Sequence, residues 1–440
     1  CPQIDKGIIM SVAIIDINDC GLCCGNALGE MIISPGYALL TEQGITTGNA
    51  ARQNAYLKPQ QSFNQFWRQL NLSPLPSPTD KARHHADLAY AQLLELHRES
   101  GSPENIIFAT PGSFDRDQLS IVLGLAKASP FKTLGLVDSA VAAASQSSLS
   151  GQLLHLDIQL HQLVLTRLAA DNHIERLQVE VIADIGLKTF YDNWARYIAN
   201  QFIQQYRYDP LHTAEGEQQL YDLLPTWLEQ INGDQELAVS LDSPQGRYRL
   251  SLNRNDLLAS SGAKLDQLQQ KLSNIRVEGE TLIASHRTKL LPGLAEQLGL
   301  VNTLPDNAAI QGCLNNLESI ADSGENIHFI TRLPNLLSAS EATDITADQA
   351  DNDHTAAAPT HILYQHRAQA IGNLLYIHRD NERLSFSQKQ PSGIALYLDN
   401  GKLYLQSEQP DVPTSDKARP LVAGDIIKVG TQSLQLIEVS

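Results

Sequence analysis

Two hydrophobic patterns divide the chain into a long first part and a short last part. Up to residue 333, short apolar runs alternate with segments of helical period. The run at 106–109, for instance, leads through a Thr110-Pro111-Gly112 turn into a helix-period segment at 115–127. A strand, a turn and a helix that packs back on the sheet form an α/β unit. From residue 361 onward the apolar positions alternate in short runs, which predicts strands alone.

The pattern of the first part predicts most of its elements. A small-residue run at 140–144 starts a helix, and the helix that ends near Phe202 carries a core stripe of Trp194, Tyr197, Ile198 and Phe202. Proline and glycine positions bound many of the segments. The other expected elements are a buried strand at 11–18, helices at 48–59, 80–98, 211–230 and 255–272, and hairpins at 151–168 and 236–252.

These patterns predict a domain organisation of three segments. Residues 10–333 form an α/β domain. Residues 334–360 form a flexible linker, because most of this segment is polar, acidic and rich in Ala, Thr and Asp, with no apolar period. Residues 361–440 form a β-sandwich, with strands at 374–377, 394–398 and 403–405 and a hairpin turn at Asp399-Asn400-Gly401.

Charge narrows the classes of partner. The 440 residues carry 32 Lys and Arg against 49 Asp and Glu, a net charge of −17. Nucleic acids and anionic membranes attract positive surfaces, so we expect neither as a partner. The chain holds no run of eighteen uncharged apolar residues, which predicts no membrane span. We take Met10 as the native start and expect a cytoplasmic protein.

Three cysteines lie close together, at Cys20, Cys23 and Cys24. Such a cluster is compatible with a metal or redox site, but no second pair or nearby histidine supplies the remaining ligands at a known spacing. We expect these residues to be packed on the first hairpin, because free cysteine behaves as a small hydrophobe.

His155 and His161 flank the turn of the hairpin at 151–168 without an obvious nucleophile, so we expect them on the strand surface.

The first domain resembles the nucleotide-binding domain of the seventy-kilodalton heat-shock chaperones, in the actin-like ATPase superfamily. The resemblance covers residues 11–320. It rests on the order and spacing of motifs, each weak alone: Asp16 after the first strand, GNAA at 48–51, TPGSF at 110–114, DSAVAAA at 138–144, ADIGLKT at 183–189, LIASHR at 282–287 and AIQGC at 309–313.

The resemblance implies a two-lobed α/β fold with a nucleotide cleft between the lobes. It points to Asp16, Asn18, Asp157 and Lys188 as residues of a vestigial cleft for ATP or ADP with Mg²⁺. The catalytic groups of the family are replaced: Ser139 stands in place of a glutamate and Ser73 in place of a lysine.

The glycines of the phosphate loops are replaced as well, and they matter because backbone N–H groups must approach phosphate closely. The second loop reads DIQLHQ at 157–162, and Asp19 in the first turn adds a negative charge. We therefore predict neither a catalytic residue nor a resident cofactor, and no metal site. We also expect no chaperone-type peptide-binding domain.

The last domain resembles a forkhead-associated domain. The matching segments are Ile371-Gly372, SGIA at 392–395 and LVAGDIIKVG at 421–430. Asn373 and Ala395 replace the arginine and histidine of the family, which thins the donors that bind phosphothreonine. Arg367, Arg379 and Arg383 are the cations that could substitute.

Together these patterns predict a catalytically degenerate, chaperone-like pseudo-ATPase. It would act as a scaffold or regulator that binds other proteins through the two-lobed domain and the sandwich. The alternative is a chaperone-family ATPase that binds ATP or ADP with Mg²⁺ weakly or in a divergent way. A redox or metal sensor through the cysteine cluster is the third hypothesis. The sequence does not identify the partner proteins.

Overall fold

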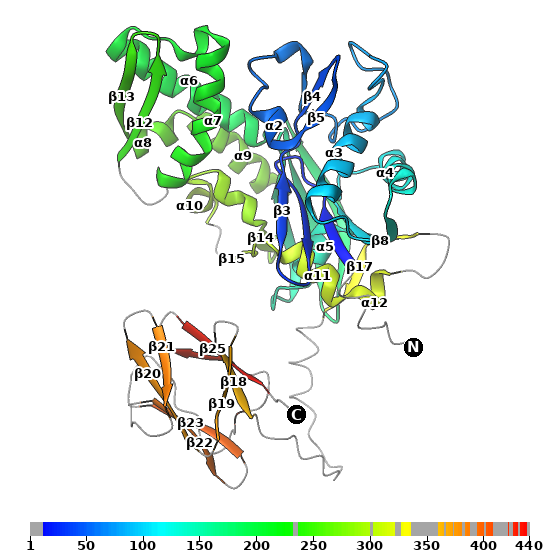
Figure 1. Ribbon diagram of the computed structural model, residues 1–440, viewed down its shortest axis with the longest axis vertical. Coiled ribbons are helices and arrows are strands. Elements are labelled where there is room, and N and C mark those ends of the chain that lie inside the picture. The colour runs from blue at the N-terminus through cyan, green and yellow to red at the C-terminus, as the bar shows by residue number, and fades with distance from the viewer. Residues whose placement is uncertain are drawn as a thin grey trace. The chain divides into compact units, whose positions relative to one another are not determined.

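The computed structural model describes residues 12–231, 236–299, 302–321, 327–335, 360–364, 367–372, 374–380, 383–387, 394–399, 402–407, 421, 426–429 and 432–437. The chain separates into two compact units, residues 1–346 and 347–440. Most of the segment expected to be a linker, 334–360, lies outside the described residues. The first unit is mixed α/β and the second is built of strands (Figure 1).

Two six-stranded sheets form the centre of the first unit. In spatial order, the first sheet consists of β16 (Phe329–Ile330), β8 (Lys132–Asp138), β7 (Asn105–Thr110), β1 (Val12–Asp16), β2 (Leu22–Asn26) and β3 (Met31–Ser34). The second consists of β15 (Asn302–Thr303), β14 (Thr281–Ala284), β9 (Gly151–Ile158), β10 (Gln162–Ala170), β11 (His173–Ala183) and β17 (Arg332–Pro334).

Five strands of each sheet follow the same plan. In the first sheet, β1, β2 and β3 form an antiparallel meander, and β7 and β8 continue the sheet parallel to β1 on its other side. In the second sheet, β9, β10 and β11 form the meander, and β14 and β15 continue it in parallel. Parallel neighbours require crossover connections, which the helices supply.

Helices cover both sheets and also lie between them. The helices are α2 (Gly48–Arg52), α3 (His85–Glu99), α4 (Arg116–Ala128), α5 (Ser139–Ala144), α6 (Leu187–Tyr206), α7 (Ala214–Ile231), α8 (Arg254–Ala259), α9 (Gly262–Ile275), α10 (Leu294–Leu298), α11 (Ala308–Asn315) and α12 (Leu317–Ile320), with 3-10 turns η1 (Pro59–Gln61), η2 (Pro210–His212) and η3 (His286–Leu290). Smaller sheets join β4 (Ala38–Thr41), β5 (Gly44–Thr47) and β6 (Ser62–Phe63), and pair β12 (Glu236–Ser243) with β13 (Gly246–Asn253).

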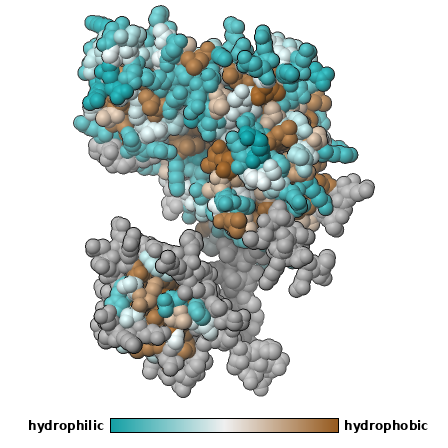
Figure 2. Space-filling view, viewed as in Figure 1, coloured by the Kyte–Doolittle hydropathy of each residue, from teal (hydrophilic) through white to brown (hydrophobic). Residues whose placement is uncertain are grey.

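Three hydrophobic clusters show how these layers pack. Residues of α5 and α11 share one cluster with the inner faces of both sheets, so this helix pair lies between the sheets. The other face of the first sheet packs on α3 and α4. The other face of the second sheet packs on α6, α7 and α9. The outer surface of this unit is mostly hydrophilic in the view of Figure 2, as expected when most apolar side chains are buried in these clusters.

The strand and helix expected at 106–109 and 115–127 are present as β7 and α4. An Asp115 capping box begins α4, with the Gln118 N–H donating to Asp115 Oδ1 at 2.8 Å. Such a box stabilises a helix start because it satisfies backbone donors that have no partner inside the helix. The expected core stripe is also present, since Trp194, Ile198 and Phe202 of α6 are buried.

Two expected helices end or break early. The helix expected at 48–59 ends at Arg52, because the Asn54 side-chain amide binds the Ala50 carbonyl and the Asn54 N–H bonds only three residues back. Gln218 on α7 then bridges the next helical position. Gln218 Nε2 donates to the Arg52 carbonyl at 3.0 Å, and the Tyr56 N–H donates to Gln218 Oε1 at 2.9 Å. The helix expected at 255–272 is divided into α8 and α9. The Ser260 hydroxyl donates to the Leu257 carbonyl there, which competes with helical bonding.

The second unit consists of two four-stranded antiparallel sheets. One has the order β19 (Arg367–Ala370), β18 (His361–Tyr364), β25 (Gln432–Ile437) and β24 (Ile426–Val429); the other has the order β21 (Arg383–Ser387), β20 (Leu374–Asp380), β22 (Ile394–Asp399) and β23 (Lys402–Ser407). Alternate side chains of both sheets share one buried cluster, so the sheets pack face to face as a sandwich. The expected turn residues Asn400 and Gly401 and the segment 392–393 lie outside the described residues.

Candidate functional site

Two aspartates face one another at equivalent ends of the two sheets. Val12 and Ile14 of β1 point into the cluster between the sheets, so Asp16, two residues further, lies on the same face. Leu153 of β9 points into that cluster too, which places Asp157 on the inner face of the second sheet. Both carboxylates are buried and both stand near the carboxyl end of the first strand of a meander. This is the edge at which α/β sheets place ligand chemistry.

Arg287 joins these two carboxylates. It lies in η3, directly after β14, and its side chain is buried. Arg287 Nη2 lies 2.6 Å from Asp16 Oδ2, and Nη1 lies 3.4 Å from Asp157 Oδ1. Burial alone would raise the pKa of Asp157, but the Arg287 charge together with the other polar contacts, among them the Asn18 hydrogen bond, holds this pKa below its ordinary value. The guanidinium therefore occupies the space between the two carboxylates and neutralises part of their charge.

The first turns of the two meanders are also bonded directly to each other. Asn18 Nδ2 donates to Asp157 Oδ2 at 2.8 Å and to the Ile158 carbonyl at 3.0 Å. Asp19 Oδ1 accepts the Leu160 N–H at 2.6 Å. The Leu160 N–H is thus already satisfied by a carboxylate of the same chain and is not free to bind an oxygen of a ligand.

Little space remains around this ion pair. The cavity beside Asp16, Asp157 and Arg287 has a volume of about 20 Å³. One water molecule needs roughly 10–15 Å³ measured in this way, so the cavity has room for about one water. Asp306 adds a third carboxylate to the lining. In this conformation the site has neither the volume nor the charge to accept a polyphosphate.

His155 was misjudged from the sequence as a surface residue. It is 3% exposed and lines the same cavity, and neither ring nitrogen has a hydrogen-bond partner among the described residues. Burial lowers the pKa of His155, which keeps the ring neutral at pH 7. The error has a structural reason: β9 is covered on both faces. Leu153, on the same face as His155, belongs to the cluster between the sheets, and Leu154 and Leu156 belong to the cluster on the other face.

Lys188 does not belong to this cluster. It lies in the first turn of α6, and its Nζ donates to Asp192 Oδ1 at 2.7 Å. Nζ also stands 5.6 Å from the ring centroid of Tyr56 and 5.4 Å from that of Tyr221. The structure thus brings together Asp16, Asn18 and Asp157 of the expected residues and places Lys188 in a separate cavity.

The sequence did not single out Arg287 as a site residue. A signal was present, because Arg287 follows a short apolar run, 282–284, that could be recognised as a buried strand. A cation at the end of one strand and carboxylates at the ends of two others meet at one edge if the strands are parallel. The parallel pairing of β14 with β9 provides this geometry.

Asp19 gives this site a measurable pH dependence. Burial, reinforced by the nearby Asp157 charge, raises the pKa of Asp19 from 3.8 to about 6, although the Leu160 hydrogen bond opposes the shift. A carboxyl whose folded pKa is raised contributes stability below the unfolded pKa, and this stability is lost as pH rises through the folded pKa. The stability that Asp19 contributes is therefore lost as pH rises from about 4 to about 6.

We accordingly expect Asp19→Asn to raise the free energy of unfolding at pH 7.5 by up to about 3 kcal/mol, because the side-chain oxygen still accepts the Leu160 N–H without a buried charge. Urea denaturation from pH 4 to pH 8 measures this gain, which should shrink toward pH 4. Asp115→Asn at the exposed start of α4 is the control and should not show the same profile. A gain at Asp19 that is independent of pH would contradict the assignment.

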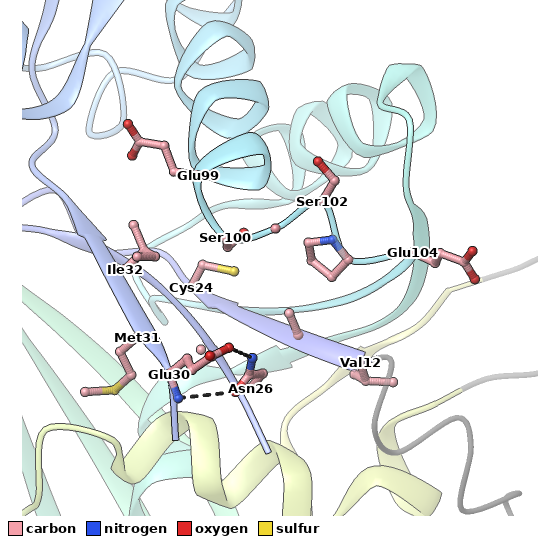
Figure 3. Close-up of a pocket in the computed structure, with 14 residues that line it drawn as sticks. Val12, Cys24, Asn26, Glu30, Met31, Ile32, Glu99, Ser100, Ser102 and Glu104 are labelled. Carbon is pink, nitrogen blue, oxygen red and sulfur yellow. Dashed lines mark hydrogen bonds between the residues drawn. The ribbon is translucent and has the colours of Figure 1, made fainter. Parts of the chain in front are cut away.

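A wider cavity of about 710 Å³ lies elsewhere on the first sheet (Figure 3). Val12 lines it, at the amino end of β1, whereas Asp16 lies at the carboxyl end. Glu30, Glu99 and Glu104 contribute to the wall, and none of the described residues lining it is Lys or Arg. Its negative lining disfavours a polyphosphate, and it lies at the opposite end of β1 from Asp16.

The cysteine cluster is packed as expected. Cys23 and Cys24 are buried on β2 and Cys20 is half-buried in the turn before it. Burial raises the pKa of Cys23 to about 12, so this thiol stays protonated and weakly reactive at neutral pH. Within the described part of the chain, no group of three or more His, Cys, Asp or Glu side chains is arranged to hold a metal ion.

Comparison with known proteins adds no identity. No protein-family model matches the chain, and no curated protein sequence matches it. Among the helices of the described residues, none combines the length and apolar character that crossing a membrane requires.

Proposed function

We propose that this protein is a catalytically degenerate member of the actin-like ATPase superfamily, similar to the seventy-kilodalton heat-shock chaperones, and acts as a scaffold or regulator that binds other proteins. The repeated strand plan of the two sheets supports the fold assignment. Each sheet has a three-stranded meander continued by two parallel strands, as expected if each sheet is the centre of one lobe. Asp16, Asp157 and Arg287, which belong to three of the resembling segments, meet beside the strand ends of these two sheets.

The observation that carries the proposal is the Arg287 guanidinium between Asp16 and Asp157. In a nucleotide-hydrolysing site, carboxylates of this kind serve the metal ion and the attacking water, and they need open space to do so. Here a cation of the chain itself is bonded to both, and the remaining volume is about 20 Å³. Ser139 at the start of α5 supplies no general base in place of a carboxylate. Each missing preorganised group costs about 3–4 kcal/mol of transition-state stabilisation.

The second unit suits an interaction role. Two sheets around one core resemble the forkhead-associated sandwich, and the Ile371-Gly372 pair lies before β20. The side chains of Arg367, Arg379 and Arg383 lie outside those that the structure describes, so phosphothreonine binding rests on the sequence alone. We propose that the first unit and this sandwich each provide a protein-binding surface.

A nucleotide test separates this proposal from the alternative of an ATP-binding chaperone. We expect ATP or ADP, with or without Mg²⁺, to leave the melting temperature of the full chain unchanged in a thermal-shift assay. A ligand present at a hundredfold excess over its Kd would stabilise by about 2.7 kcal/mol and raise the melting temperature by about 5 °C. A rise of this size that needs Mg²⁺ and disappears in Asp157→Asn would overturn the proposal in favour of nucleotide binding.

The scaffold role has its own test. Partners that co-purify with the tagged full chain should remain bound after the nucleotides of the extract have been hydrolysed, and should not be released by added ATP and Mg²⁺. Release by ATP but not by ADP would show a nucleotide-gated chaperone cycle instead.

A further inference from the structure

A third cavity, the one that Lys188 lines, also includes Leu160 in its wall. It is bounded by the residues around α2 on one side and by α6 and α7 on the other, elements that stand next to each other at the top of the first unit in Figure 1. Its volume is about 140 Å³. An apolar protein cavity of about 150 Å³ accommodates one benzene molecule. The cavity therefore has the size of a single substituted six-membered ring.

Tyrosines form much of its wall. The rings of Tyr56 and Tyr221 stack with their centroids 4.1 Å apart and their planes 17° from parallel. Tyr37 and Tyr191 also line the cavity, together with the aliphatic side chains of Leu160, Leu187 and Leu290. Aromatic walls favour planar rings, because stacked and edge-to-face contacts add to the burial of apolar surface. Burial raises the pKa of Tyr37 to about 12, so its phenol stays neutral at pH 7.

One charged side chain of this cavity, Lys188, forms an ion pair, with Asp192. The Asp222 carboxylate is satisfied by a neutral donor, since it accepts Gln218 Nε2 at 3.0 Å. Arg52 lines the cavity, and its Nε is buried without a hydrogen-bond partner among the described residues. In this part of the chain Arg52 also forms no ion pair, although the Arg52 charge is close enough to influence Tyr37, Tyr191 and Asp222. A guanidinium that forms no ion pair at an aromatic pocket favours a carboxylate.

We propose that this pocket binds a small aromatic carboxylate, of which benzoate is the simplest, with its ring among the tyrosines and its carboxylate on Arg52. The proposal goes beyond the scaffold function, since it concerns a separate cavity and does not depend on whether a nucleotide binds. Polar groups that fix orientation in a mainly apolar pocket are the usual arrangement of small-molecule sites.

Titration calorimetry of the full chain tests this site with four probes: benzoate, benzyl alcohol, benzylammonium and inorganic phosphate. We expect benzoate to bind at least about tenfold more tightly than benzyl alcohol, because a charge-assisted hydrogen bond to Arg52 distinguishes the two. Benzylammonium and phosphate should bind more weakly than benzoate, the first for its charge and the second for lack of a ring.

Variants assign the effect to Arg52. Arg52→Met should remove the preference for benzoate, Arg52→Lys should keep part of it, and Arg116→Met on the exposed face of α4 should not change it. Thermal melts establish that each variant is folded, and Arg52→Lys keeps the test valid if Arg52→Met does not fold. Absence of benzoate binding at millimolar concentration, equal binding of benzyl alcohol or phosphate, tighter binding of benzylammonium, or an unchanged preference in folded Arg52→Met or Arg52→Lys would each overturn the proposal.

Discussion

Replacing Arg287 by methionine should lower the free energy of unfolding by about 3–5 kcal/mol at pH 7, as expected when one partner of a buried ion pair is removed. Methionine keeps much of the length of the side chain but leaves Asp16 and Asp157 without their shared cation. These carboxylates are 5% and 6% exposed, so water does not replace the guanidinium effectively. Urea denaturation of the variant and the parent protein measures the difference.

Two controls separate the charge from the packing of Arg287. A triple variant that combines Arg287→Met with Asp16→Asn and Asp157→Asn should recover most of the lost stability, because it removes the unpaired charges while the amide oxygen introduced by Asp157→Asn can still accept the Asn18 amide. Millimolar Mg²⁺ should stabilise the single variant but not the triple variant, since two facing carboxylates attract a hard cation. A loss below 1 kcal/mol, or an equal loss in both variants, would show that the ion pair is incidental.

The single variant Arg287→Met should also reverse the pH dependence of stability that Asp157 contributes. In the parent protein the pKa of Asp157 is lowered from 3.8, so its contribution to stability is present above that value and is lost as pH falls through the lower, folded pKa. Without Arg287, burial and the Asp16 charge raise the pKa of Asp157, and the penalty of the variant should shrink as pH falls toward 4. Denaturation at pH 4.5 and pH 7.5 compares the two slopes.

The sequence predicted those parts of the fold that depend on local pattern. The apolar run at 106–109 and the helical period at 115–127 specify β7 and α4, because each is set by neighbours in the chain and by a cap at Asp115. Asp16 was also predictable, since it follows an apolar run that reads as a strand, whereas Asp157 was singled out by the family resemblance. A strand end fixes the position of a side chain along the sheet but not what stands opposite to it.

What the sequence could not predict depends on contacts between distant segments. Arg287 reaches Asp16 across 271 positions of the chain, and Asn18 reaches Asp157 across 139. Gln218 on α7 likewise reaches the Arg52 carbonyl across 166 positions of the chain. His155 was misjudged because alternation along one strand does not reveal that another layer of the fold covers its polar face. These long-range contacts convert a set of cleft residues into a closed, self-paired site.

The close packing of α5 and α11 between the two sheets gives the second large prediction. A Cβ atom at Gly312 on α11 would lie 1.8 Å from the carbonyl oxygen of Ala142 on α5 and 2.9 Å from the Ser145 Oγ. The first contact is to backbone, so a change of rotamer cannot relieve it, and the helices must move apart. Both helices pack on the two sheets at once, so any shift disturbs one shared core.

We therefore expect Gly312→Ala to cost about 3 kcal/mol or more of unfolding free energy, at or above the upper end of the range for overpacking in a core, because the clash is with backbone. Gly124→Ala is the matched control: it makes the same change on the exposed side of α4, where nothing lies within 4 Å of the added Cβ. That variant should be neutral or more stable by up to about 1 kcal/mol, because alanine favours helix. Urea denaturation compares the two, and limited proteolysis does so if Gly312→Ala does not accumulate as folded protein. Similar stability of both variants would mean that α5 and α11 can separate without disturbing the sheets.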